Sequence, residues 1–181
     1  LSIYFFFFSA KKQLSSVLLG ALLFVLSARI GKSVAYFFDY SLPKIYLQLG
    51  LTACLFIGPF LYFYIRSELG QVRKLPRSWA WQLVGWSAVI GLTGILYPYE
   101  SVPRLWGKTI IPLIYIQWGI YVIVVVISLI PVIKKIARKE TVKPYEKWVL
   151  SICAGVLMLW SSYVYSILGI TKGSYIFGAL I

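Results

Sequence analysis

The stretch VLSARIGKSVAYFFDY, residues 25–40, places two cations, Arg29 and Lys32, among side chains that are otherwise mostly apolar. If a helix runs from about Gln13 to Tyr40, its centre lies near residue 26, with Arg29 about 4 Å and Lys32 about 8 Å beyond it. A charged side chain at the centre of a bilayer costs about 2.5 kcal/mol or more. We therefore expect Arg29 to face other helices and to have a polar partner there.

Polar residues continue from this pair at three- and four-residue steps, which places them on one side of a helix. The resulting polar stripe consists of Arg29, Lys32, Ser33, Tyr36 and Asp39. Asp39 lies about 15 Å along the helix from Arg29, so its carboxylate reaches Lys32 or Tyr36 more easily. Two cations thus face one anion. The excess charge fits a binding site for a small anionic or amphiphilic ligand, a buried structural cation, or an ion pathway.

Several groups are candidates to balance this excess charge. They are backbone carbonyls near Gly58 and Pro59, tyrosine hydroxyls, the carboxylate of Glu100, and an anionic ligand. Gly58 and Pro59 also predict a hinge. A proline inside a helix removes one backbone hydrogen bond and crowds the carbonyl of the residue four positions earlier, here Leu55.

Catalytic and metal chemistry has few side chains to use. The chain has no His, which excludes imidazole bases and histidine metal ligands within it. Its five acidic residues all fall at predicted helix ends or in loops, so they form no buried carboxylate relay. The two cysteines, Cys54 and Cys153, are expected at different depths and so are not expected to form a disulfide. We expect no enzymatic activity, no cofactor and no metal site.

Long apolar segments carry these residues. Hydrophobic residues make up 60% of the 181, and the mean hydropathy is +0.84. Because a membrane-spanning helix needs about 20 apolar residues, the sequence predicts an all-α, polytopic helical membrane bundle that forms a single domain over residues 1–181. Five complete helices are predicted at residues 13–39, 44–66, 79–97, 109–133 and 147–169. Residues 1–9 and 173–181 are predicted to be partial helices, which gives seven helices in the parent protein.

The formal net charge of +13 is distributed unevenly between the loops. The loops after the first, third and fifth predicted helices hold twelve Lys and Arg residues, whereas the intervening loops hold four. Because basic loops tend to stay in the cytoplasm, this alternation predicts a multi-pass protein of the bacterial inner membrane with its N-terminus outside and its C-terminus in the cytoplasm. The lipid bilayer is therefore the first expected partner, and most of the basic excess reports topology rather than nucleic-acid binding.

Short motifs along the chain resemble a known family. They are FIGPFLYFYIRS at residues 56–67, then LPRSW, the helix end YPY, EKWVLSI and SYIFGALI, with LSARIGKSVAYFF fitting the second helix. Together they resemble the N-terminal membrane domain of AraC-type transcriptional regulators of Bacteroidota. Members often have a His just before the Leu-Pro of the third loop, where this chain has Lys74. The resemblance implies a cytoplasmic helix-turn-helix domain after the bundle, so that DNA would be bound only through a domain outside this chain.

Three functions fit these observations. The first is a membrane-embedded sensory domain that controls a cytoplasmic DNA-binding domain, and it implies a homodimer because such regulators bind paired half-sites. The second is a non-catalytic accessory or structural subunit of a larger inner-membrane complex, held by partner membrane subunits. The third is a transporter, which predicts internal repeats or paired broken helices. The sequence has one interrupted helix and no repeat, so this function ranks last.

Overall fold

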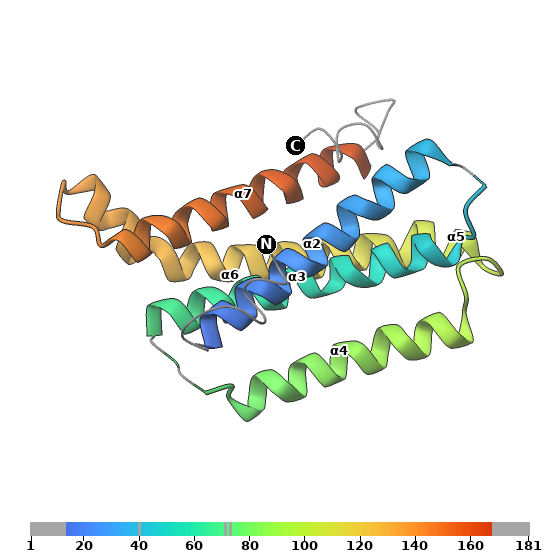
Figure 1. Ribbon diagram of the computed structural model, residues 1–181, viewed down its shortest axis with the longest axis horizontal. Helices are drawn as coiled ribbons and strands as arrows, with labels where there is room; N and C mark the ends of the chain where they lie inside the picture. The colour runs from blue at the N-terminus through green and yellow to red at the C-terminus, as the bar shows by residue number, and fades with distance from the viewer. Residues whose placement is uncertain (1–13, 40, 71, 73, 168–181) are drawn as a thin grey trace.

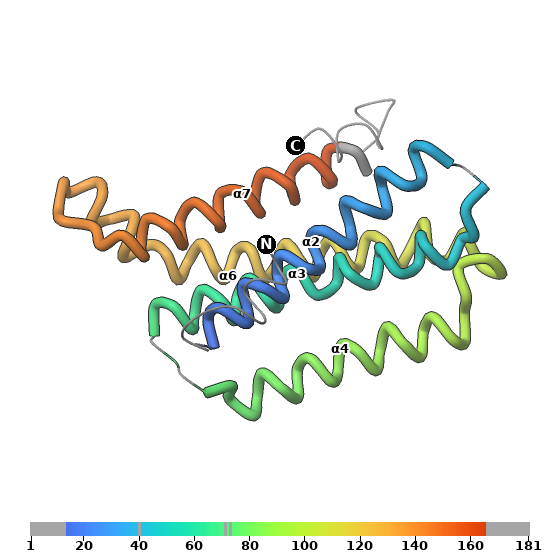
Figure 2. The backbone as a smooth tube through the Cα atoms, viewed as in Figure 1, coloured from blue at the N-terminus to red at the C-terminus, as the bar shows by residue number. Residues whose placement is uncertain are grey.

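The computed structural model describes residues 14–39, 41–70, 72 and 74–167, and this part of the chain is helical, with no strand (Figures 1 and 2). A short helix, α5, and a π-helical turn, η1, lead directly into α6, so that Pro103–Ala137 forms one continuous span. Five spans are long and apolar enough to cross a membrane, which confirms the predicted all-α bundle. The elements are α2 (Leu14–Phe38), α3 (Ile45–Gly70), α4 (Arg77–Leu96), α5 (Pro103–Leu105), η1 (Trp106–Ile110), α6 (Ile111–Ala137) and α7 (Pro144–Ile167).

Several helix ends differ from the predicted ones, and glycine or proline marks two of them. α3 continues four residues further, to Gly70, where the N–H of Val72 donates to the carbonyl of Ser67 at 3.1 Å and closes the helix. α7 begins at Pro144, because proline fits the first turn of a helix without loss of a hydrogen bond. The helices predicted at residues 1–9 and 173–181 lie outside the described residues, and the count of seven depends on them.

α3 is the central helix of the bundle. It packs along α2 and α6 and makes smaller contacts with α4 and α7. Its side chains are buried on several faces, and Ile57, Leu61 and Phe63 are completely inaccessible. A helix that is apolar and buried all round belongs in the interior of a bundle. α3 is therefore the helix through which the others are held together.

α4 lies at the edge of the bundle, apart from the other long helices (Figure 1). Ile90 is its one buried residue, and among the described elements its backbone approaches only that of α3. Large apolar side chains on its outer surface, such as Trp81 and Ile95, are 73% and 78% exposed. In a bilayer these side chains would face lipid. No Cα atom of α4 comes within 8 Å of a Cα atom of α6 in the described part of the chain, so only side chains bridge the two helices.

Two glycines allow other helices to approach closely. A Cβ atom built on Gly58 of α3 would lie 2.9 Å from Cδ2 of Tyr121 of α6. A Cβ atom built on Gly119 of α6 would lie 2.8 Å from the ring of Trp160 of α7. Since such distances are too short for real Cβ atoms, both positions need glycine for the aromatic rings to pack as they do.

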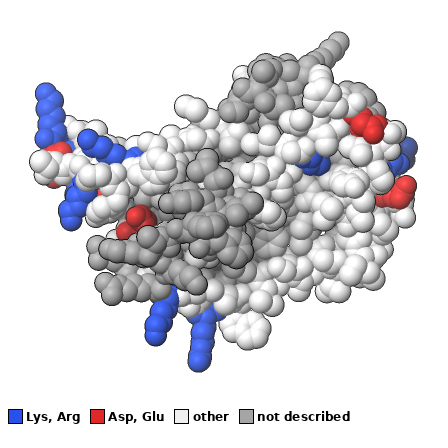
Figure 3. Space-filling view, in the orientation of Figure 1, with Lys and Arg blue, Asp and Glu red and all other residues white. Residues whose placement is uncertain are grey.

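The turn between α6 and α7 is held by an acidic side chain. Glu146 accepts hydrogen bonds from Nζ of Lys135 and from the backbone N–H of Lys143, both at 2.8 Å. The carboxylate thereby caps the first turn of α7, where the helix dipole also favours negative charge. The charged side chains visible in Figure 3 gather mainly toward the ends of the helices. This is the distribution that a bundle of membrane-spanning helices requires.

Candidate functional site

Arg29 is 8% exposed and points into the bundle, where it meets hydroxyl groups and an aromatic ring. One terminal nitrogen donates to Oγ of Ser33 at 3.0 Å, and the other donates to the hydroxyl of Tyr115 at 3.1 Å. The guanidinium carbon lies 4.6 Å from the centre of the Tyr163 ring, a cation–π contact. Nε has no hydrogen-bond partner among the described residues. Of the partners considered from the sequence, the structure thus supplies one tyrosine hydroxyl, that of Tyr115.

The side chain of Arg29 connects α2 to two helices whose backbones lie further from it. α2 packs against α3, and in the described residues no Cα atom of α2 comes within 8 Å of α6 or α7. Tyr115 belongs to α6 and Tyr163 to α7, so the long arginine side chain spans from α2 to both. We call these residues, together with Ser33, the arginine cluster. Its geometry fits a clamp between three helices.

The rest of the predicted polar stripe separates into different environments. Lys32 is partly buried, and its methylene groups lie over Gly50 of α3. Tyr36 is partly buried and Asp39 is exposed. The Asp39 carboxylate accepts hydrogen bonds from the backbone N–H and the hydroxyl of Ser41, at 2.8 and 2.5 Å.

The loop after α2 thus provides two donors for Asp39, two residues along the chain. The two hydrogen bonds from the side chain and backbone of Ser41 also hold the pKa of Asp39 below its usual range. Binding of an anionic ligand at the stripe stays a prediction.

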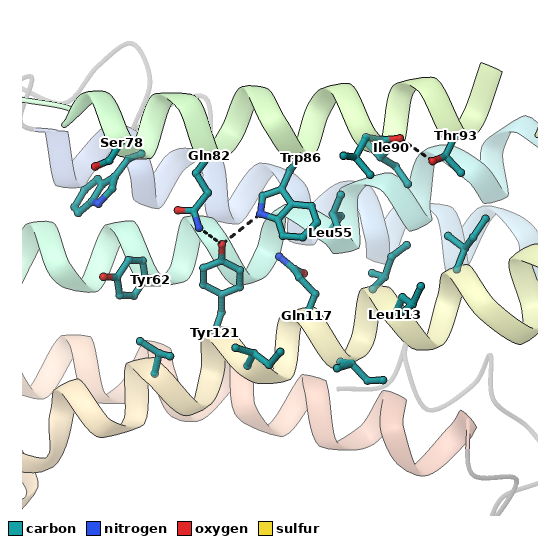
Figure 4. Close-up of a pocket in the computed structure, with 17 residues that line it drawn as sticks. Leu55, Tyr62, Ser78, Gln82, Trp86, Ile90, Thr93, Leu113, Gln117 and Tyr121 are labelled. Carbon is teal, nitrogen blue, oxygen red and sulfur yellow. Dashed lines mark hydrogen bonds between the residues drawn. The ribbon is translucent and has the colours of Figure 1, made fainter. Parts of the chain in front are cut away.

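A second polar region lies on the other side of α3. A cleft of about 780 Å³ opens between α4 and α6, with α3 as its floor (Figure 4). Its lining within the described chain is mostly aliphatic and aromatic and includes no charged residue. No residue of the predicted stripe contributes to it. The volume falls in the range of small-molecule sites, about 300 to 1,000 Å³.

Four polar side chains converge in this cleft. The hydroxyl of Tyr121 accepts hydrogen bonds from the amide of Gln82 at 2.6 Å and from the indole N–H of Trp86 at 3.3 Å, which links α6 to α4 across the cleft. Gln117 is 9% exposed, and neither its oxygen nor its nitrogen has a partner among the described residues. Figure 4 shows its amide pointing from α6 toward Trp86, into the cleft. A buried amide without partners carries a free-energy penalty that a bound group would remove.

Comparisons with known proteins identify no relative of this chain. No family model, no curated protein and no solved structure matches the chain. The resemblance to AraC-type regulators therefore stays a prediction from the motifs quoted above.

The predicted hinge lies next to the cleft. Gly58 and Pro59 are both buried within the continuous helix α3, and Gly58 contacts the ring of Tyr121. Tyr121 in turn lines the cleft and binds the two side chains of α4. A change in the bend of α3 at this point would thus move the Tyr121 ring and, with it, the hydroxyl that binds Gln82 and Trp86. The hinge itself stays a prediction.

Reasoning from the sequence missed the cleft. Gln82 and Gln117 were the available signal, since an uncharged amide inside an apolar span is uncommon and needs a partner. The described residues bring together no group of three His, Cys, Asp or Glu side chains that could hold a metal ion. Cys54 and Cys153 are both buried and free.

Proposed function

We propose that this chain is a membrane-embedded sensory domain that binds a bilayer-soluble molecule in the cleft between α4 and α6 and transmits binding as a movement of α4. The observation that carries this proposal is the amide of Gln117, buried without a hydrogen-bond partner among the described residues and beside an open cleft of about 780 Å³. A purely structural bundle gains nothing from leaving this amide unpaired. A ligand that completes its hydrogen bonds would stabilise one arrangement of the helices over another.

The packing provides a means of transmission. The backbone of α4 approaches only that of α3 among the described elements, and hydrogen bonds from Gln82 and Trp86 to Tyr121 connect α4 to α6, so its distance from α6 depends on a few side chains. A molecule that contacts both walls of the cleft would favour the arrangement in which α4 and α6 fit it best. Binding shifts a conformational equilibrium only if the two states differ in affinity. α3, which contacts all the other long helices, would pass the shift to α2, α6 and α7.

The proposed output is a cytoplasmic DNA-binding domain after the seventh helix. Two independent observations support it: the motifs that resemble AraC-type regulators, and the twelve-to-four distribution of basic residues, which predicts a cytoplasmic C-terminus. The protein would then be a bacterial inner-membrane regulator and would act as a homodimer on paired DNA half-sites.

The test uses the intact gene in its own host. A chromosomal Gln117→Leu variant is compared with a gene deletion and with Ser128→Ala, a control on the same helix. Ser128 donates to the carbonyl of Val124 at 2.9 Å and does not line the cleft. RNA sequencing, at membrane levels matched by immunoblot, is expected to show an overlapping set of changed transcripts in the deletion and in Gln117→Leu, and none in Ser128→Ala. A deletion that changes no transcript would rule out the regulator.

A second candidate is an accessory subunit of a larger membrane complex. The outer surface of α4, with exposed side chains such as Trp81 and Ile95, favours it because a partner helix could pack there as well as lipid. Native mass spectrometry after mild solubilisation separates the two functions. A homodimer supports the sensor, and a stoichiometric complex with other membrane chains supports the subunit.

A further inference from the structure

The polar groups of the cleft form an uncharged set. Gln117 offers one carbonyl acceptor and two N–H donors, none of them used within the described residues. The Tyr121 oxygen already accepts two hydrogen bonds, from Gln82 and Trp86, so its own O–H remains to donate. No charged residue of the described chain lines the cleft. A carboxylate, phosphate or ammonium group would enter without a counter-charge, which is costly in a membrane interior.

The depth of the polar groups restricts the ligand further. In the span Pro103–Ala137, Gln117 lies three residues from the central position, or about 4.5 Å along the axis. It is thus near the middle of a bilayer that this span would cross. A phospholipid keeps its charged head group at the membrane surface and would present only acyl chain at this depth. A molecule that brings hydrogen-bonding groups to Gln117 must carry a small, uncharged head.

The open edge of the cleft faces the outside of the bundle. Leu113, Ile116 and Ile120 of α6 line it and are between 57% and 58% exposed, and Val89 on the opposite wall is 56% exposed. These apolar edges would lie against lipid tails, so a ligand would arrive sideways from the bilayer. The remaining lining, with the rings of Trp79 and Tyr62, accommodates an apolar body.

We propose that the cleft between α4 and α6 binds an uncharged, long-chain lipid whose small head, an alcohol or primary amide, both donates and accepts hydrogen bonds at Gln117 and accepts one from Tyr121. The head would occupy the space between the two side chains, which lie one helical turn apart on α6. The chain would run along the apolar walls. The role of this ligand as a signal rests on the proposed function. Its chemical class is inferred from the cleft alone.

The test uses the purified chain in phosphatidylcholine nanodiscs and three photoreactive C16 probes with a diazirine in the chain: an alcohol, the matching carboxylic acid and the matching alkane. We expect the alcohol to label residues of α4 and α6 at the cleft, and excess 1-hexadecanol to suppress that labelling. We expect about five- to tenfold less cleft labelling by the acid and the alkane, and a similar loss for the alcohol with Gln117→Leu, which corresponds to the removal of one to two buried hydrogen bonds. Ser128→Ala should label like the wild type.

Tyr121→Phe serves as a second variant, and it should reduce labelling by the alcohol less than Gln117→Leu does. Thermal unfolding and gel filtration confirm that each variant folds. Equal labelling by all three probes, unchanged in Gln117→Leu, would mean that ordinary lipid chains fill the cleft and would overturn the proposal, as would preference for the acid. If the alcohol binds as expected but the transcripts in the host do not change, the site stands and the sensory function fails. If the transcripts change but the alcohol labels Gln117→Leu as strongly as the wild type, the sensory function is supported and the proposed ligand class is wrong.

Discussion

Arg29 and Gln117 are both at least nine-tenths buried, and both lie inside helices long enough to span a membrane, yet the bundle surrounds them differently. Arg29 has two hydrogen bonds to hydroxyls and a ring face, drawn from three helices. Gln117 has no hydrogen bond within the described residues and borders an open cleft. The charged side chain, which stands out in the sequence, is the one that the fold itself accommodates.

The physical reason lies in the free energies of the two groups. A buried guanidinium is so unfavourable without partners that a helix carrying it must provide them within the bundle. A neutral amide costs a few kcal/mol at most when unpaired, so a fold tolerates it where function requires. A buried charge is therefore weaker evidence for a ligand than an unsatisfied neutral group beside an open space.

The largest effect is expected from removal of the partners of Arg29. The double variant Tyr115→Phe, Tyr163→Leu deletes a hydrogen bond to a charged group and a cation–π contact, which together amount to about 2 to 5 kcal/mol. The free energy of unfolding in mixed micelles, titrated with SDS, should fall by this amount. Tyr163→Phe is the matched control, because it keeps the ring and removes a hydroxyl that has no partner in the described chain. A double variant as stable as this control would show that Arg29 needs no clamp.

The second-largest effect on stability is expected at the contact between Gly58 of α3 and Tyr121 of the cleft. Gly58→Ala would place its Cβ 2.9 Å from Tyr121, and overpacking of this kind costs about 1 to 3 kcal/mol. The displaced ring should also lose its bonds to Gln82 and Trp86, visible as an altered tryptophan emission. Gly31→Ala is the control, since nothing lies within 4 Å of its new Cβ and alanine favours the helix. Equal stabilities for both variants would mean that α3 does not rely on close packing at Gly58.

A smaller effect, of opposite sign to that at Arg29, is expected at Gln117. Gln117→Leu removes from the interior an amide that has no partner in the described part of the chain, so the unfolding free energy should stay within about 1 kcal/mol of the wild type or rise. The same SDS titration measures it. A loss of 2 kcal/mol or more would show that the amide has a structural partner and would remove the contrast with Arg29.

The smallest effect concerns Asp39, outside the membrane spans. Because its pKa is held below the usual value near 3.9, its hydrogen bonds from Ser41 stabilise the fold fully above that value and are lost as the pH falls through the lower folded-state pKa. Thermal unfolding at pH 7 and pH 3 should differ more for the wild type than for Asp39→Ala. Identical pH dependence in the two proteins would contradict this local role.

The sequence predicts the parts of this molecule that depend on one helix at a time. Length and hydropathy are sufficient for the five spans, and the depth of Arg29 is sufficient to place it in the interior. The cleft depends on the distance between α4 and α6. The pattern of apolar residues within either helix does not predict that distance. The donors of Asp39 had a signal in the sequence: Ser41, two residues later, is where an aspartate commonly finds backbone and hydroxyl donors in a turn.

The central claim, that filling the cleft moves α4 relative to α6, can be measured directly by pulsed electron paramagnetic resonance. Genetically encoded spin-labelled residues at Ser87 on α4 and Ile123 on α6, both exposed, report the distance between the helices in nanodiscs, with and without 1-hexadecanol. The account predicts a shifted and narrower distance distribution with the alcohol in the wild type, and no change in Gln117→Leu. The same distribution with and without the alcohol in the wild type would contradict it.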